Sequence, residues 1–339
     1  MSLPSKLESR VVHYHQPVGL STLFRPLSKI LKDGIRPILD VTYKPSDNGP
    51  FLRFSAKAAL GIPEQTLLLV LMELAKQQYE VFANDVIVDD ETGSDIGRKL
   101  WSILHKDGSF KGEQTLRLET CWYELNRRCG SQTGGSTQAL RSLQLERLCE
   151  VVVWEHAGDE KKTKRQSNLV VWLVGNDERI HLALNCRLAS AILGKPYSQV
   201  SLAERLALKR DIPMALHAFL STTISHGHHL KIGLERLIDR LWPDSADTAL
   251  ASTHRGRRSH VHDGLVAIGR LDGWTVEWER KDLAVVTRLG AGVADMTSHK
   301  QNKTMSYQKQ ALPIIINKTK GFATFDASGL FFTKVNVPA

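Results

Sequence analysis

Three stretches decide the fold of this chain: GLERLIDRLW at residues 233–242, THRGRRSHVHDGLVAIGRL at residues 253–271 and WTVEWERKDLAVVTR at residues 274–288. The first is a short amphipathic pattern that stops at Pro243, and the second is a longer helical pattern with four arginines. The third holds two strand-like runs around the turn Arg-Lys-Asp. The order helix, loop, helix, strand, turn, strand predicts a winged helix, in which one helix enters the major groove of DNA and the hairpin touches the backbone.

The longer helical stretch has an apolar face and a basic face. Val261, Leu265 and Ile268 recur at helical spacing and predict the face that packs on the core. Arg255 and Ser259 fall on the opposite side of the helical wheel, where they would meet the floor of the groove.

Arginines on a helix are common on solvated surfaces, so composition alone does not establish DNA contact. Here they cluster in the first turn of the second helix of the motif, which is the part that winged helices insert into the groove. Arg257 and Arg258 flank the apolar face and are expected to hold the phosphates beside the groove. His262 is expected on the basic side.

Residues 121–174 repeat the same order of predicted helices and strands. Residues 121–129 and 135–148 are predicted to be helices, and residues 150–156 and 167–174 are predicted to be strands. The segment between the strands is a basic tip, which would be the wing. Its cations are Lys161, Lys162, Lys164 and Arg165.

The second helix of residues 121–174 also has two predicted faces. We expect Leu140, Leu143 and Leu148 to pack on the core. Gln138, Arg141 and Ser142 are expected to point outward, toward DNA.

Periodicity predicts further elements upstream of the two motifs and between them. Strands are expected at residues 39–43, 51–55 and 179–184, and apolar helices at residues 63–77 and 211–225.

We therefore predict an α+β fold with two tandem winged-helix domains. The first is expected over residues 20–175 and the second over residues 176–290. Residues 1–19 are expected to form a flexible arm, and residues 291–339 a tail of unknown role.

The composition fits a globular protein that binds a polyanion. The 339 residues are enough for two domains, and 42% of them are apolar. The formal charge of +9 favours nucleic acid, because cations that neutralise phosphates release counterions. We expect a cytoplasmic protein, because the sequence has no apolar run of membrane length and no signal-peptide core. Cys121, Cys129, Cys149 and Cys186 lack zinc spacing and are expected to be reduced thiols.

The candidate DNA-binding residues share a position on a predicted second helix or on a hairpin tip. They are Ser136, Thr137, Gln138, Arg141, Ser142, Lys161, Lys162, Lys164, Arg165, Thr253, His254, Arg255, Arg257, Arg258, Ser259, His262, Arg280 and Lys281.

Two other classes of function stay open. His13 and His15 flank Tyr14 in a pattern that supplies metal ligands in rolling-circle nicking endonucleases, with Tyr123 as the candidate nucleophile. Such an enzyme needs a third ligand and a sheet that holds the histidines, so we predict no metal site and no catalytic residue. The second alternative is a transcriptional regulator with the same DNA-binding architecture. No cofactor is expected either, since the sequence holds no phosphate-binding glycine motif.

In its order of motifs the chain resembles the replication initiator RepC of IncQ-type broad-host-range plasmids. The resemblance extends from residue 23 to residue 288. It is carried by LFRPL (residues 23–27), LDVTY (Leu39–Tyr43), HLALN (residues 181–185), the Trp-Pro pair at 242–243, STHRGRRSHV (residues 252–261) and GWTV (residues 273–276).

This resemblance implies tandem winged helices that bind directly repeated iterons in a plasmid origin. It further implies opening of the adjacent AT-rich DNA, so that a separate helicase and primase can start. Self-association on or off the DNA is a separate expectation. By position, residues 136–141 match the first recognition helix and residues 253–262 the second. The lysine-rich wing is longer than the family pattern, and the last fifty residues have no counterpart in it.

Overall fold

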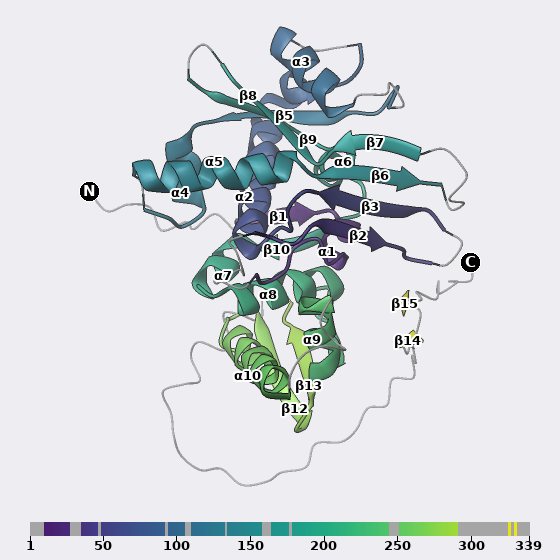
Figure 1. Ribbon diagram of the computed structural model, residues 1–339, viewed down its shortest axis with the longest axis vertical. Coiled ribbons are helices and arrows are strands. Elements are labelled where there is room, and N and C mark those ends of the chain that lie inside the picture. The colour runs from purple at the N-terminus through teal and green to yellow at the C-terminus, as the bar shows by residue number, and fades with distance from the viewer. Residues whose placement is uncertain are drawn as a thin grey trace.

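The computed structural model describes residues 10–27, 35–46, 49–91, 94–105, 110–132, 134–157, 164–175, 178–243 and 251–290, together with residues 325–326 and 329–330. Figure 1 shows an upper unit with two sheets around a long helix, and a lower unit of helices packed on a small sheet. We use "upper unit" for residues 35–192 and "lower unit" for residues 202–290. The predicted α+β class is confirmed.

A long helix, α2 (Ile62–Phe82), is the centre of the upper unit. Its first turn is capped by Glu64, whose Oε2 accepts the backbone N–H of Gly61 at 2.9 Å. The side chains of residues 67–72 are all fully buried, so protein surrounds this part of the helix on every side. The helix predicted over residues 63–77 is confirmed and extends further.

Two four-stranded antiparallel sheets flank α2, with the strand orders β2-β3-β6-β7 and β4-β5-β9-β8. The strands of the first are β2 (Leu39–Tyr43), β3 (Phe51–Ala56), β6 (Val152–His156) and β7 (Lys164–Asn168). Those of the second are β4 (Ile87–Val88), β5 (Thr115–Thr120), β8 (Val170–Val174) and β9 (Ile180–Leu184). Leu169 lies between β7 and β8 and donates its N–H to the carbonyl of Val151 at 2.9 Å. One extended segment therefore passes from the first sheet to the second.

The other elements of the upper unit lie around these sheets. They are the short 3₁₀ helix η2 (Ala83–Val86), α3 (Asp95–Leu104), α4 (Trp122–Arg128), α5 (Gly135–Cys149) and α6 (Cys186–Ile192). In Figure 1, α4 and α5 lie together on one side of α2, and the β2–β3 and β6–β7 hairpins extend to the other side.

The lower unit has the order helix, helix, strand, helix, helix, hairpin. Its elements are α7 (Leu202–Ala207), α8 (Asp211–Thr223), β11 (His229–Gly233), α9 (Leu234–Leu241), α10 (Ala251–Ile268), β12 (Trp274–Arg280) and β13 (Leu283–Arg288). The sheet order is β11-β13-β12, so the first strand pairs with the last strand of the hairpin.

A two-stranded sheet lies between the two units. It pairs β1 (Val11–Tyr14) with β10 (Ser198–Ser201), and the short helix α1 (Gln16–Leu20) follows β1. Val12 and Tyr14 are fully buried. The prediction of a flexible arm over residues 1–19 is therefore wrong for residues 10–19, because alternate residues of β1 are part of the core.

Three arginines tie the lower unit to the rest of the chain. Arg205 on α7 donates to Thr66 Oγ1 at 3.2 Å and to Gln65 Oε1 at 2.9 Å, both on α2. Arg240 on α9 donates to three consecutive carbonyls at the end of α1. Arg288 on β13 donates to the carbonyl of Gln199 on β10 at 2.7 Å. Buried backbone carbonyls need donors, so these contacts fix how the two units meet.

The expected boundary between residues 175 and 176 falls inside a hairpin of the upper unit. β8 and β9 pair from Val170 with Leu184 to Val174 with Ile180. β9 also pairs with β5, so the upper unit includes β9 and α6.

Within the predicted tail, residues 291–339, the structure describes four residues, which form the paired strands β14 (Phe325–Asp326) and β15 (Gly329–Leu330). Among the described helices, none is both long enough and apolar enough to cross a bilayer.

Candidate nucleic-acid interface

Helix α10 has the two faces that its sequence predicts. Val261, Leu265 and Ile268 are fully buried, in the core shared with α8 and α9. Arg255 and Ser259 are exposed on the opposite side. Within the described residues Arg255 forms no ion pair.

A glycine sets how closely α10 approaches α8. A Cβ at Gly264 would lie 2.8 Å from Leu216 Cδ1 and 3.5 Å from Ile212 Cγ2, both on α8. Real side chains do not pack at 2.8 Å, so any larger residue would force the Leu216 side chain or the helix to shift.

Two predicted DNA contacts of α10 are already engaged within the lower unit. Arg258 Nη1 donates to Glu235 Oε1 on α9 at 2.9 Å, and its Nη2 pairs with Asp282 in the β12–β13 turn. His254 Nε2 lies 2.8 Å from Glu235 Oε2. In this structure Arg258 therefore fixes α10 relative to α9 and the hairpin. A phosphate would have to compete with two carboxylates for it.

Aromatic contacts hold two further predicted residues. The guanidinium of Arg257 lies over the ring of Trp242 with its Cζ 5.0 Å from the centroid. His262 stacks on Trp278 of β12 with ring centroids 4.5 Å apart and an interplanar angle of 19°. The sequence did not lead us to predict that Trp278 contacts a candidate residue. The one pattern that could have indicated it is the alternation of strand β12, which places Trp278 on the same face as Trp274.

The β12–β13 turn, whose Asp282 pairs with Arg258 of α10, carries two exposed cations, Arg280 and Lys281. Lys231 Nζ on β11 lies 3.0 Å from Glu279 Oε2 on β12, so this ion pair spans the intervening strand β13. Thr253 is exposed in the first turn of α10. The predicted residues of the lower unit thus lie on α10 and at the β12–β13 turn that contacts it.

The predicted faces of α5 are wrong. Leu140 and Leu143, expected in the core, are 52% and 42% exposed, whereas Arg141, expected to face DNA, is 5% exposed. Leu148 is fully buried as predicted. Ser136 and Gln138 are exposed, and Thr137 and Ser142 are half-buried.

Arg141 is buried because it satisfies polar groups between the two helices. Its Nε donates to Asn126 Oδ1 at 3.3 Å on α4, and its Nη2 donates to Ser131 Oγ at 3.0 Å in the turn. Nη1 donates to Gln144 Oε1 at 2.7 Å, one turn further along α5. A buried amide or hydroxyl oxygen without a donor is costly, so this arginine holds the helix pair together.

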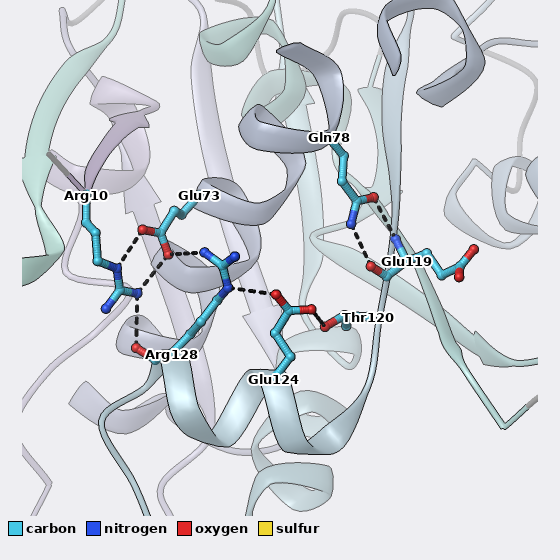
Figure 2. A network of polar contacts seen from close by, with 7 residues as sticks. All are labelled: Arg10, Glu73, Gln78, Glu119, Thr120, Glu124 and Arg128. Carbon is cyan, nitrogen blue, oxygen red and sulfur yellow. Dashed lines mark hydrogen bonds and ion pairs between the residues drawn. The ribbon is translucent and has the colours of Figure 1, made fainter. Parts of the chain in front are cut away.

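Figure 2 shows how α4 is fixed to the centre of the upper unit. Glu73 on α2 accepts Arg10 Nε at 2.7 Å and pairs with Arg128 Nη1 at 3.2 Å. Arg128 Nε also donates to Glu124 Oε1 at 3.0 Å, and Glu124 Oε2 accepts the hydroxyl of Thr120 at 3.1 Å. The hydrogen bond to Glu73 raises the pKa of Arg10. The network links β1, α2, β5 and α4, so α4 has little freedom to tilt.

A second contact in Figure 2 joins α2 to β5. Gln78 Nε2 donates to the carbonyl of Glu119 at 2.6 Å, and its Oε1 accepts the N–H of the same residue at 3.0 Å. Helix α5 is fixed to α2 in turn by Arg147 Nη1, which lies 3.0 Å from the buried carboxylate of Glu64.

The structure describes only part of the predicted basic tip of the upper unit. Arg165 lies on β7, with its Nη2 3.1 Å from Glu113 Oε1 and its Cζ 4.1 Å from the centroid of the Phe110 ring. Its guanidinium is thus packed against the protein, not extended at a tip as predicted. Lys161 and Lys162 lie outside the described residues, as does the side chain of Lys164.

The two histidines of the nickase alternative lie on and just after β1. His13 stacks on Tyr197 at 3.7 Å between centroids, and burial lowers the pKa of His15 to about 4. Within the described ranges no three His, Cys, Asp or Glu side chains are placed to hold a metal ion together.

All four cysteines are free thiols in the structure. Burial raises the pKa of Cys129 to about 11 and of Cys186 to about 12, so both stay protonated at neutral pH. The thiol of Cys186 lies 3.2 Å from His105 Nε2 but is buried. This pair has neither the thiolate nor the access that a nucleophile needs.

These features define an α+β protein whose two units each present a pair of short helices beside a sheet. Comparison with protein families then gives the particular group. The family model described as "Replication protein C (RepC)" matches residues 9–288, so this chain belongs to the RepC family of replication proteins. The predicted resemblance is confirmed.

Solved structures with a similar fold include two of RctB. A crystal structure of RctB domains 2-3 has a TM-score of 0.48 and 9% sequence identity, and covers 83% of this chain and 99% of that chain. A selenomethionine derivative of RctB domains 2 and 3 has a TM-score of 0.47 and 11% identity, and covers 77% of this chain and 95% of that chain. A search of curated proteins gave no match.

Proposed function

We propose that this protein initiates replication by binding double-stranded origin DNA through two winged-helix units. The lower unit supports this with its order α8, β11, α9, α10 and a β12–β13 hairpin whose second strand pairs with β11. The upper unit supports it with the pair α4 and α5, followed by the β6–β7 hairpin.

One observation carries the proposal: the outward face of α10. Arg255 and Ser259 project from it, opposite the buried stripe, and the cations Arg280 and Lys281 lie at the adjacent hairpin tip. An arginine on such a face can donate two hydrogen bonds to guanine in the major groove. Cations at a hairpin tip neutralise phosphates.

The upper unit would contribute a different kind of contact. The exposed side chains of α5 include Ser136, Gln138, Leu140 and Leu143, with no cation among these four. Gln can pair with adenine, and apolar side chains contact the methyl group of thymine. We infer that α5 contributes to reading AT-containing sequence, while α10 supplies the cationic contact.

The connection between the units supports binding to direct repeats. Arg205, Arg240 and Arg288 fix the lower unit to α2, to the end of α1 and to β10. Burial lowers the pKa of Arg205 and of Arg240 to about 10, so both stay charged at neutral pH and keep their contacts. Two helices at a fixed separation in one chain read a long asymmetric site without needing a palindrome.

The remaining steps follow from binding and need no catalysis by this chain. Bending a site of this length costs several kcal/mol, which binding energy can supply, and AT-rich DNA beside the site would open. A separate helicase and primase would then enter, and copies of the protein on neighbouring iterons would contact one another.

Selection of bound duplexes from a random pool tests the proposal. We expect one asymmetric motif that occurs as direct repeats in the replication origin, and supercoiled origin DNA that stays intact with Mg²⁺ or Mn²⁺. Recovery of a palindrome would favour a dimeric regulator instead, and a nicked strand would favour the endonuclease with His13 and His15.

A further inference from the structure

The upper unit contains a cavity of about 520 Å³ that the duplex contacts proposed above do not use. It is formed where the β2–β3 and β6–β7 hairpins meet α6 and the start of α1, away from α4 and α5 in Figure 1. Ligand sites of proteins fall in the same range of volumes.

Rings and prolines form most of the cavity wall. Tyr43, Phe51 and His156 line it together with Pro45 and Pro50. Phe51 and His156 stack on each other with centroids 4.1 Å apart and an interplanar angle of 9°. A wall of this kind suits a flat ring.

Two buried polar atoms at the cavity have no hydrogen-bond partner among the described residues. They are Nδ1 of His15 and Nε of Arg165. The low pKa of His15, about 4, keeps its imidazole neutral at pH 7. A buried polar atom without a partner is costly, so a ligand that pairs with both atoms would be favoured.

The charged groups of the cavity are balanced. Arg187 makes two hydrogen bonds to Glu155, at 2.9 and 2.6 Å, and Arg165 pairs with Glu113. Each arginine of the lining is thus paired with a glutamate, Glu155 in the lining and Glu113 outside it, which suits an uncharged group with donors and acceptors at its edge. The cation Lys44 lies between the lining residues Tyr43 and Pro45 and is exposed, with its Nζ 5.2 Å from the centroid of the Phe51 ring.

We propose that this cavity holds one unstacked nucleobase of single-stranded DNA. A base is flat, is uncharged and carries donors and acceptors at its edge, and the phosphate attached to it would lie outside, near Lys44. Bases in a duplex are stacked and cannot enter a concave site, so the ligand is a melted strand. The inference rests on the proposed function only in taking the ligand to be DNA.

The experiment measures binding of a fluorescent twelve-nucleotide oligo(dT) by anisotropy. Tyr43→Ala removes a ring of the wall and should weaken binding about tenfold. Arg165→Lys keeps the charge but removes the unpaired Nε–H, and should weaken binding about fivefold. Tyr197→Ala is the matched control, because it removes a partly exposed tyrosine outside the cavity and should leave affinity unchanged.

A second measurement does not depend on how the variants fold. A strand that carries 5-iodouracil should crosslink on irradiation to Tyr43, Phe51 or His156 of the unaltered protein. Crosslinks confined to other elements, or equal affinities of Tyr43→Ala and Tyr197→Ala, would overturn the proposal. So would free dTMP that binds as tightly as the oligonucleotide, since the ligand would then be a nucleotide and not a strand.

Duplex binding separates this proposal from the previous one. Tyr43→Ala should bind an origin duplex normally, because Tyr43 is not among the side chains of α5, α10 and the β12–β13 turn that are proposed to contact the duplex. A protein that binds oligo(dT) through the cavity but no duplex would refute the proposed function and leave the single-strand site intact.

Discussion

The two helices expected to read DNA present opposite kinds of side chain. Helix α10 buries Val261 and exposes Arg255, as an amphipathic pattern predicts. Helix α5 buries Arg141 and exposes Leu140 and Leu143. Both follow a short helix and precede a hairpin, so the difference comes from what lies beneath each helix.

The side chains that α10 packs against are apolar, whereas some of the side chains beneath α5 are polar. Asn126 on α4 and Ser131 in the turn are covered by α5 and need hydrogen-bond donors. An arginine supplies several donors and a long apolar stem, so it is the residue that fits there. Polar groups on a neighbouring element can therefore reverse the face that a helix buries.

The largest effect expected from this comparison is on stability. Arg141→Ala removes the donors to Asn126, Ser131 and Gln144 at once, and should lower the free energy of unfolding by about 3 kcal/mol. Urea denaturation measures this change. Gln138→Ala, on the exposed side of the same helix, is the control and should change stability by less than about 0.5 kcal/mol. If Arg141→Ala kept full stability and lost only DNA affinity, the buried role assigned to it would be wrong.

The next effect is on specificity and belongs to α10. Arg255→Ala should weaken binding to the selected site by about 1–3 kcal/mol and leave binding to random duplex nearly unchanged, because the alanine can no longer pair with a base. Competition anisotropy with the selected and scrambled duplexes measures both. Arg270→Ala removes an exposed arginine beyond the end of α10 and serves as the control. Equal losses on both duplexes would mean that Arg255 holds a phosphate.

The lower unit was largely predictable from the sequence because its elements are local and strongly patterned. Helix α10 has a regular apolar stripe, and β12 and β13 alternate around a short turn. Strands β2 and β3 were also predicted, within a residue of their observed bounds.

The errors arose where partners far apart in sequence decide the structure. Tyr14 is buried because β1 packs against α2 and pairs with β10, almost two hundred residues later, and no local pattern reports those contacts. Arg165 is predicted at a basic tip, yet Phe110 and Glu113 hold it from another part of the chain. Glu73 and Arg10 likewise meet across 63 residues.

A smaller effect tests whether the hairpin beside α10 touches phosphate. Arg280→Ala combined with Lys281→Ala should make the slope of log K against log salt shallower by about two units, one for each phosphate that is no longer neutralised. Ser136→Ala on α5 removes no charge and should not change the slope. Titration of duplex binding across salt concentrations measures this. An unchanged slope in the double variant would mean that the hairpin of the lower unit stays clear of the backbone.

The smallest effect concerns how α10 is positioned. Arg258 was predicted to hold a phosphate, but it pairs with Glu235 at 2.9 Å and with Asp282. The side chains are partly exposed, so the pair with Glu235 should contribute about 0.5 kcal/mol to stability. A double-mutant cycle with Arg258→Ala and Glu235→Gln, followed by urea denaturation, isolates this coupling. Salt should weaken it.

DNA binding by the same variant gives the outcome that would contradict this role. In the absence of coupling, Arg258 would be free for DNA, and the salt slope of Arg258→Ala would fall by about one unit, as for a residue that neutralises a phosphate. If the coupling is present, Arg258→Ala should leave the slope of log K against log salt unchanged, because Arg258 neutralises no phosphate. The variant should still bind the selected site more weakly at every salt concentration, because α10 is less firmly oriented.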